Sequence, residues 1–134
     1  MTTTLGTKLK IASWDEASTR EFEDGSKLTR ADVELIDGTD GLVSGSFSSV
    51  MYYRPDGTSS FGTVMHLTGT LDGCTGSIVL VGEGTYDGTT ASNRAHIVDG
   101  SGTGDLVGIT GNCESDSTHA DYPFMPLTLT YDFG

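Results

Sequence analysis

Residues 43–73 read VSGSFSSVMYYRPDGTSSFGTVMHLTGTLDG. Two alternating segments flank Pro55-Asp56-Gly57, where proline presets φ for a turn and glycine enters positive φ without a Cβ clash. This pattern predicts two antiparallel strands, Val43–Arg54 and Ser60–Leu71, joined by a tight turn. Period-two alternation assigns one face of each strand to the interior. Those faces carry Phe47, Ser49, Met51 and Tyr53 on the first strand, and Phe61, Thr63, Met65 and Leu67 on the second.

The same turn signal recurs outward along the chain in both directions. Seven Asp-Gly dipeptides begin at Asp24, Asp37, Asp40, Asp56, Asp72, Asp87 and Asp99. The segments between them predict six further strands. These are Thr7–Ser13, Lys27–Ile36, Ser77–Tyr86, Thr90–Val98, Gly108–Glu114 and Leu127–Phe133. We expect residues 14–24 to form a loop or one helical turn, and residues 115–126 to form a longer loop.

Eight strands in 134 residues predict an all-β fold, a single eight-stranded antiparallel up-and-down barrel of calycin-like form. We expect residues 1–134 to be one domain. A barrel of eight strands is just wide enough to be filled by side chains or to hold one small ligand.

The charge balance excludes some partners. The chain has 7 basic and 19 acidic residues and a net charge of −12, which disfavours nucleic acid and anionic lipid. No apolar run approaches the roughly 20 residues of a membrane helix, so we expect no membrane insertion. The first residues lack the apolar core of a signal peptide, and we expect a cytoplasmic protein.

The segment Gly100-Ser101-Gly102-Thr103-Gly104-Asp105-Leu106-Val107-Gly108-Ile109-Thr110-Gly111 resembles the Gly-Thr-Gly turn of allene-oxide-cyclase-like and dirigent-like barrels. Five further segments strengthen the resemblance to a microbial family of small barrels of unknown function. They are Ser13-Trp14-Asp15-Glu16, Lys27-Leu28-Thr29-Arg30-Ala31, Tyr53-Arg54-Pro55-Asp56-Gly57-Thr58, Thr68-Gly69-Thr70-Leu71 and Tyr131-Asp132-Phe133. The resemblance implies an eight-stranded barrel over nearly the whole chain, and it implies chemistry only weakly.

Four positions depart from the pattern of that family. By this resemblance, the family often has a glutamate where this chain has Met65 and a histidine where it has Gly82. It often has a tryptophan where this chain has Ala95 and a polar residue where it has Leu35. All four lie on strand faces that alternation assigns to the lumen. The implied consequence is a roomier and drier cavity, filled either by neighbouring side chains or by a ligand.

Familiar catalytic and metal-binding patterns are absent from the sequence. His66 and His96 fall on outward faces, His119 falls in the late loop, and none has metal-ligand spacing, so we expect no metal and no cofactor. No serine lies in a nucleophile-elbow pattern. Residues 100–104 are rich in glycine but have no P-loop lysine, so we expect these glycines to form a turn. Acidic pairs at 15/16 and 37/40 are expected to be solvated turn residues. Cys74 and Cys113 could be neighbours, either bonded or as free thiols.

The predicted lumen is mostly apolar and aromatic with a few hydrogen-bonding groups, which is typical of a small-molecule pocket. Tyr53, Asn93 and Tyr131 are the candidate catalytic residues, because their polar groups could polarise a carbonyl or hold an epoxide oxygen. The candidate substrate-binding residues are Leu35, Phe47, Ser49, Met51, Phe61, Met65, Gly82, Tyr86 and Ala95. The alternative is that the same side chains simply pack the core.

Three functions fit these observations. The first is a cofactor-independent cyclase or isomerase of secondary metabolism that folds a reactive polyene or epoxide, including by cycloaddition. The second is a non-catalytic barrel that binds a hydrophobic metabolite. The third is a filled barrel that acts as an assembly module. Homo-oligomerisation is expected through an outer face that carries Val50, Tyr52, Val64 and His66.

Overall fold

The computed structural model describes residues 2–39, 41–118 and 120–133. Within these residues the chain forms eight strands and one short 3₁₀ helix. The elements are β1 (Thr3–Glu21), β2 (Lys27–Ile36), β3 (Leu42–Tyr53), β4 (Ser59–Leu71), β5 (Cys74–Tyr86), β6 (Thr90–Ile97), η1 (Gly104–Leu106), β7 (Thr110–Thr118) and β8 (Phe124–Asp132).

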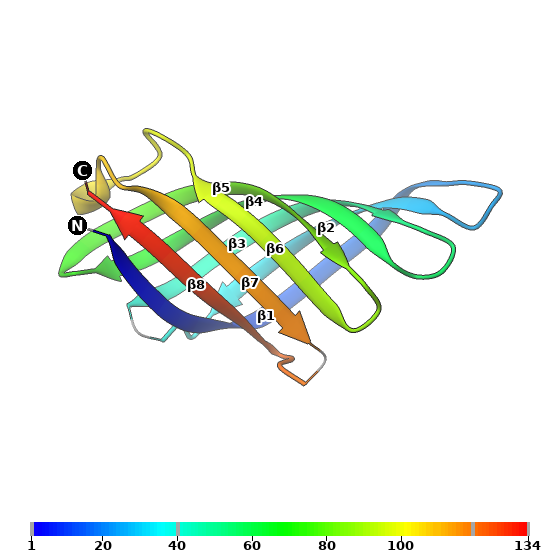
Figure 1. The fold of residues 1–134 in the computed structure, drawn as a ribbon, viewed down its shortest axis with the longest axis horizontal. Coiled ribbons are helices and arrows are strands. Elements are labelled where there is room, and N and C mark those ends of the chain that lie inside the picture. Colours follow the sequence, from blue (N-terminus) through cyan, green and yellow to red (C-terminus); the bar gives the residue numbers. More distant parts are fainter. Residues whose placement is uncertain (1, 40, 119, 134) are drawn as a thin grey trace.

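Each strand pairs antiparallel with the next, and β1 pairs with β8, which closes the sheet into a barrel (Figure 1). The all-β, eight-stranded antiparallel fold predicted from the turns is therefore confirmed. The start of β1 and the end of β8 lie at the same end of the barrel, beside η1 (Figure 1).

Strand β1 is much longer than the alternation of Thr7–Ser13 predicts. Residues 3–10 pair with β8, and residues 10–21 pair with β2. The register of β1 against β2 shifts at Ile11/Ser13 and at Ser18/Arg20. Such bulges bend a strand, so the two parts of β1 can pair with different neighbours. The β1–β2 hairpin therefore extends well past the other strands (Figure 1, blue and light blue). The expectation of a loop or helical turn at residues 14–24 was wrong for residues 14–21.

Strands β7 and β8 also differ from their predicted bounds. β7 begins at Thr110 and runs to Thr118, and β8 begins at Phe124, so just over half of the loop expected at residues 115–126 is strand. Serines have little intrinsic preference for strands, but Ser115 and Ser117 pair with Asn93 and Ala91 on β6. Pairing with a neighbouring strand outweighs the weak local preference.

Four of the Asp-Gly turns show two kinds of geometry. Asp72 and Gly73 both have positive φ, 50° and 78°, which is the two-residue hairpin that Asp-Gly favours. At three other turns the aspartate carboxylate instead accepts hydrogen bonds from the residue two positions later. The donors are the backbone N–H groups and hydroxyls of Ser26, Thr58 and Thr89, on Asp24, Asp56 and Asp87 respectively.

The end of the barrel beside η1 is packed solid. All strands except β6 and β7 contribute side chains that are at most 2 % exposed. Leu106 and Ile109, in and just after η1, are buried against them. The strand residues in this packed half include Leu9, Val33, Leu35, Leu42, Leu67, Leu71, Ile78, Leu80, Leu127 and Leu129. Tyr131 donates its hydroxyl to Asp72 Oδ2 over 2.9 Å and ties β8 to the β4–β5 turn at this end.

The Gly-Thr-Gly segment has a structural part in this closure. It runs beside the half of β5 that β6 does not reach, and Thr103 N–H donates to the Ser77 carbonyl over 2.9 Å. A Cβ on Gly76 would lie 2.0 Å from the Thr103 carbonyl oxygen, so glycine is required for this close approach. The glycines of residues 100–104 thus shape a loop that completes the sheet.

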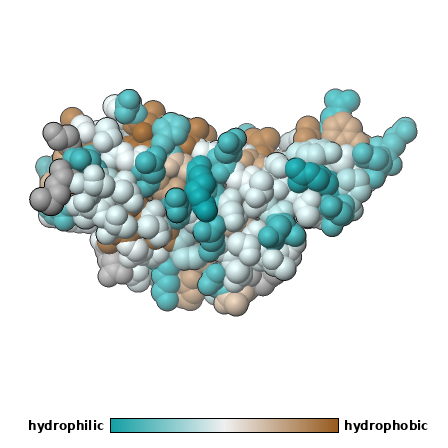
Figure 2. Space-filling view, viewed as in Figure 1, coloured by the Kyte–Doolittle hydropathy of each residue, from teal (hydrophilic) through white to brown (hydrophobic). Residues whose placement is uncertain are grey.

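The outer surface carries the predicted exposed residues. His66 and His96 face outward, whereas His119 and Asp40 lie outside the described residues. Val50 and Val64, on the predicted association face, are 61 % and 52 % exposed. Polar residues predominate on the outer face over β6–β8 (Figure 2).

Both cysteines are free thiols. Cys113 is buried, and burial, together with the nearby Glu114 carboxylate, raises the pKa of its thiol to about 12. Cys74 is only half-buried.

Candidate functional site

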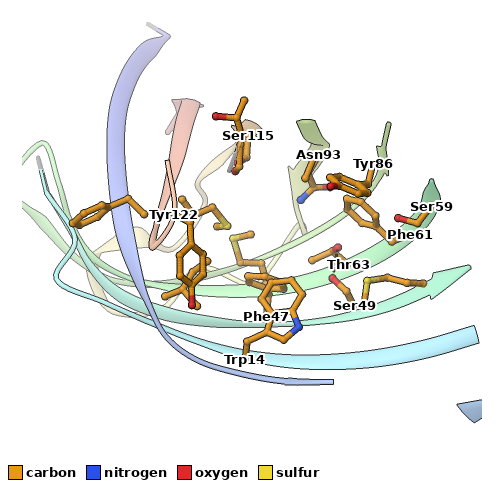
Figure 3. A pocket seen from close by; sticks show the side chains of 18 of the residues that line it. Trp14, Phe47, Ser49, Ser59, Phe61, Thr63, Tyr86, Asn93, Ser115 and Tyr122 are labelled. Carbon is orange, nitrogen blue, oxygen red and sulfur yellow. Dashed lines mark hydrogen bonds between the residues drawn. The ribbon is translucent and has the colours of Figure 1, made fainter. Parts of the chain in front are cut away.

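The end of the barrel opposite η1 holds a cavity of about 320 Å³. Its lining includes Ser59, Thr89 and Tyr122, which lie at or beside the β3–β4, β5–β6 and β7–β8 turns, and Figure 3 shows its side chains. The lumen is therefore packed in one half and open in the other. A volume of this size is at the lower limit of known ligand pockets.

One wall of the cavity is bulky and apolar. Strands β3 and β4 bring Met51 opposite Phe61 and Phe47 opposite Met65. The inward polar groups of this wall satisfy one another, because Ser49 Oγ and Thr63 Oγ1 are hydrogen-bonded at 2.8 Å in a buried position. This wall offers a molecule in the cavity mainly aromatic and thioether surface.

The wall formed by β6 and β7 is small and polar. Asn93 lies beside Ser115, and Ala91 lies beside Ser117 (Figure 3). Asn93 Oδ1 is buried, and no described residue gives it a hydrogen bond. The Ser115 and Ser117 hydroxyls are 3.4 Å apart, longer than a strong O–H···O bond.

Trp14 of β1 stands at the mouth of the cavity, with its ring edge-on to Phe47 at a centroid distance of 6.0 Å (Figure 3). Its Nε1–H donates to Glu16 Oε1 over 2.8 Å, and Glu16 Oε2 accepts from the Thr29 hydroxyl over 2.9 Å. Tyr122, from the β7–β8 turn, also lines the cavity and is 69 % exposed.

Tyr53 presents a neutral phenol to the cavity. Burial, and then the nearby Glu16 carboxylate, raise the pKa of its hydroxyl to about 12. The Lys27 ammonium lies 5.3 Å from the centre of its ring. Tyr53 is protonated at neutral pH, as a tyrosine of ordinary pKa also is, and its hydroxyl donates to Met51 Sδ over 3.6 Å, a weak bond that an oxygen acceptor would replace.

The structure brings eight of the twelve predicted site residues into the cavity wall. They are Phe47, Ser49, Met51, Tyr53, Phe61, Met65, Tyr86 and Asn93. The other four, Leu35, Gly82, Ala95 and Tyr131, do not line the cavity. Leu35, Ala95 and Tyr131 point into the barrel nearer the packed end, and Gly82 has no side chain.

Each of these four predictions needs a physical correction. Tyr131 is at the opposite end, bonded to Asp72. Leu35 is 1 % exposed within the packed half. Gly82 and Ala95 face each other so closely that a Cβ on Gly82 would lie 2.7 Å from the Ala95 Cβ, and no spare volume remains there. Alternation predicts which face a residue occupies but not its height along the barrel axis.

Several residues in or beside the cavity were missed by sequence reasoning, among them Trp14, Glu16, Ser115 and Tyr122. Trp14 and Glu16 lie in the segment expected to be a loop, and Ser115 and Tyr122 lie in the late loop. A usable signal existed for Ser115. Serines at 115 and 117 alternate with acidic Glu114 and Asp116. The bulge between Ile11 and Ser13 reverses the alternation of β1, so the two-residue period alone would place positions 14 and 16 on the outward face. Tyr122 had no such signal.

In the part of the chain that the structure describes, no three His, Cys, Asp or Glu side chains stand close enough together to hold a metal ion. None of the helices found among these residues could cross a membrane.

The fold and the cavity define a class: a closed antiparallel barrel of eight strands with a half-open lumen. Residues 6–131 match the family described as a protein of unknown function, DUF3224, and the chain belongs to that family. A crystal structure of a DUF3224 protein of unknown function from Shewanella oneidensis MR-1 is similar to it. The two share 16 % identity, with a TM-score of 0.75 over 100 % of this chain and 99 % of that one. No curated protein matches the chain.

Proposed function

We propose that the open half of the barrel binds a small, largely apolar molecule. The observation that carries this proposal is the contrast between the two halves: one is packed to near-zero exposure, whereas the other keeps about 320 Å³ free between aromatic side chains. An empty apolar cavity costs stability, which a bound molecule would offset. A barrel that serves only as an assembly module needs no open lumen.

The test uses naphthalene-sized probes and the lone tryptophan of the chain, Trp14. Its single indole N–H resonance should shift on titration with 2-methylnaphthalene. In Ala91→Phe, an aromatic ring would occupy the cavity and the shift should be lost. The matched control is Thr85→Phe, on an outward, exposed position of β5, which should leave it unchanged. Equal titration of wild type and Ala91→Phe would contradict the proposal.

Cyclase or isomerase activity is a second candidate, favoured by the neutral Tyr53 phenol in the wall. The cavity would hold a polyene or epoxide in a reactive conformation while ring closure proceeds through the bonds of the substrate itself. Tyr53 would donate a hydrogen bond to an oxygen that gains negative charge. The resemblance to allene-oxide-cyclase-like barrels is compatible with this chemistry and stays a prediction.

This candidate predicts a changed product ratio from a triene or epoxide that also closes spontaneously. Wild type should accelerate closure and enrich one stereoisomer. Tyr53→Phe should keep the enrichment, which depends on shape, but slow closure by about a hundredfold to a thousandfold, the effect of losing one donor to the developing charge. Unchanged rate and ratio with every substrate tested would leave binding as the function.

Self-association is a separate proposal. Val50, Val64 and Val81 place exposed apolar side chains on adjacent strands of the outer face, a feature of protein interfaces. Sedimentation of wild type and Val64→Lys would test it, because a buried lysine would dissociate the assembly.

A further inference from the structure

We infer that the cavity takes a neutral, flat, largely apolar molecule with hydroxyl or carbonyl groups along one edge, and that Asn93 recognises this edge. The inference rests on the proposed binding function and names the class of ligand. It follows from the unlike chemistry of the two cavity walls.

The β3–β4 wall suits the flat face of such a molecule. Phe47, Met51 and Phe61 form its surface, and the hydroxyls of Ser49 and Thr63 already bond to each other. An aromatic or conjugated body can lie against these side chains without leaving a polar group unpaired.

The β6–β7 wall suits the polar edge. Along β6 the inward positions are Ala91, Asn93, Ala95 and Ile97, so Asn93 is the polar residue among them. Its cross-strand neighbours are Gly84, over which the Phe61 ring packs, and the small Ser115. Rotation about χ2 lets the amide present either its N–H₂ or its carbonyl oxygen to the lumen.

The hydrogen-bonding state of this wall also points to a ligand. Asn93 Oδ1 is buried without a partner among the described residues, although buried polar atoms are normally paired. The 3.4 Å contact between Ser115 and Ser117 leaves their hydroxyls weakly engaged. Oδ1 has almost no accessible surface in this rotamer, so a ligand with hydroxyl or carbonyl groups would bond the amide after rotation about χ2.

The charge distribution selects a neutral molecule. Among the described residues that line the cavity none is charged, so an ionised group inside would have no counter-ion. Glu16 lies beside the mouth, and the net charge of −12 opposes the entry of anions.

The experiment compares three probes of one size: 2-naphthol, 2-methylnaphthalene and the anion 2-naphthoate. Calorimetric titration should show that wild type binds 2-naphthol about threefold to tenfold more tightly than 2-methylnaphthalene, the value of one or two hydrogen bonds. 2-Naphthoate should bind most weakly. In Asn93→Leu, of similar volume, the preference for 2-naphthol should disappear while 2-methylnaphthalene binding stays within about twofold. Ser92→Ala, an outward position of the same strand, is the control.

A measurement on wild type alone guards against misfolding of the variant. The side-chain N–H₂ resonances of Asn93 should shift more with 2-naphthol than with 2-methylnaphthalene. Equal affinities of wild type for these two probes, or tighter binding of 2-naphthoate, would overturn the inference and leave the proposed binding function standing. Failure of all three probes to bind would overturn the proposed function itself.

Discussion

Trp14 and Glu16 lie two residues apart on the same face of β1, and the indole N–H donates to the carboxylate over 2.8 Å. Because Glu16 also accepts from Thr29 on β2, it anchors the ring to the barrel. Trp14 is 47 % exposed, so little packing would hold it at the cavity mouth without this bond.

Glu16→Ala should therefore loosen the indole ring. Trp14 is the sole tryptophan, and its fluorescence anisotropy should fall and its emission shift to the red in this variant. Asp15→Ala is the matched control, since Asp15 is exposed and strand alternation turns it to the face opposite Trp14 and Glu16. Identical anisotropy in wild type and Glu16→Ala would show that packing against Phe47 alone positions the ring.

Gly84→Ala should destabilise the barrel. The new Cβ would lie 2.1 Å from the Ser92 carbonyl oxygen and 2.7 Å from the Phe61 ring, so backbone must shift. We expect a loss of about 1–3 kcal/mol in the free energy of unfolding, measured in urea. Gly62→Ala, whose Cβ has nothing nearer than 4.0 Å, should stay within about 0.5 kcal/mol of wild type. Equal effects of the two substitutions would contradict this packing.

Tyr131→Phe tests the corrected position of that tyrosine. Removing the hydroxyl that donates to Asp72 should cost about 1 kcal/mol of stability. Probe affinity should not change, because the residue is at the closed end of the barrel. A double-mutant cycle uses Asp72→Asn, because asparagine tolerates the positive φ of this turn. Adding Asp72→Asn to Tyr131→Phe should lower the free energy of unfolding little further. Weaker probe binding by Tyr131→Phe would return this residue to the functional site.

The aspartate-capped turns predict a pH dependence. Hydrogen bonds from Thr89 and Thr90 hold the pKa of Asp87 below its ordinary value of 3.8, as Ser26 does for Asp24 and Thr58 for Asp56. A lowered folded pKa means that the stabilisation is fully present above pH 3.8 and is lost as the pH falls through the folded value.

The stability difference between wild type and Asp87→Asn should accordingly be largest near neutral pH and should vanish in strong acid. Urea midpoints measured across this range provide the check. Acidification also relieves the charge repulsion in a chain of net charge −12. This effect is common to both proteins and cancels in the difference between their midpoints. A difference that stays constant with pH would mean that the charge on Asp87 contributes nothing.

The two thiols should react unequally. The raised pKa and burial keep Cys113 protonated and shielded at neutral pH, whereas Cys74 is partly exposed. Iodoacetamide should therefore modify one equivalent, mapped to Cys74 by mass spectrometry, and reach Cys113 only in denaturant. Cys74→Ser should remove the fast reaction altogether. Fast modification of Cys113 in the folded protein would show that β7 opens readily.

The turn chemistry and the two-residue alternation were sufficient to predict eight antiparallel strands and the inward faces of most of them. Asp-Gly and Pro-Asp-Gly act through their own backbone preferences, so they can be interpreted locally. The strand from residue 14 to 21 and the second half of β7 could not be predicted in this way. Their polar residues have weak strand preference, and pairing with β2 and β6 holds them extended.

The candidate site divides along the same line. The sequence alone determined that Met51, Phe61 and Asn93 point into the barrel, because alternation follows from the geometry of an extended chain. Only the tertiary structure decided that Asn93 lines an open cavity while Tyr131 lies in a sealed end. Strand tilt and register set the height of each side chain along the axis, and these arise from contacts between strands that are distant in sequence.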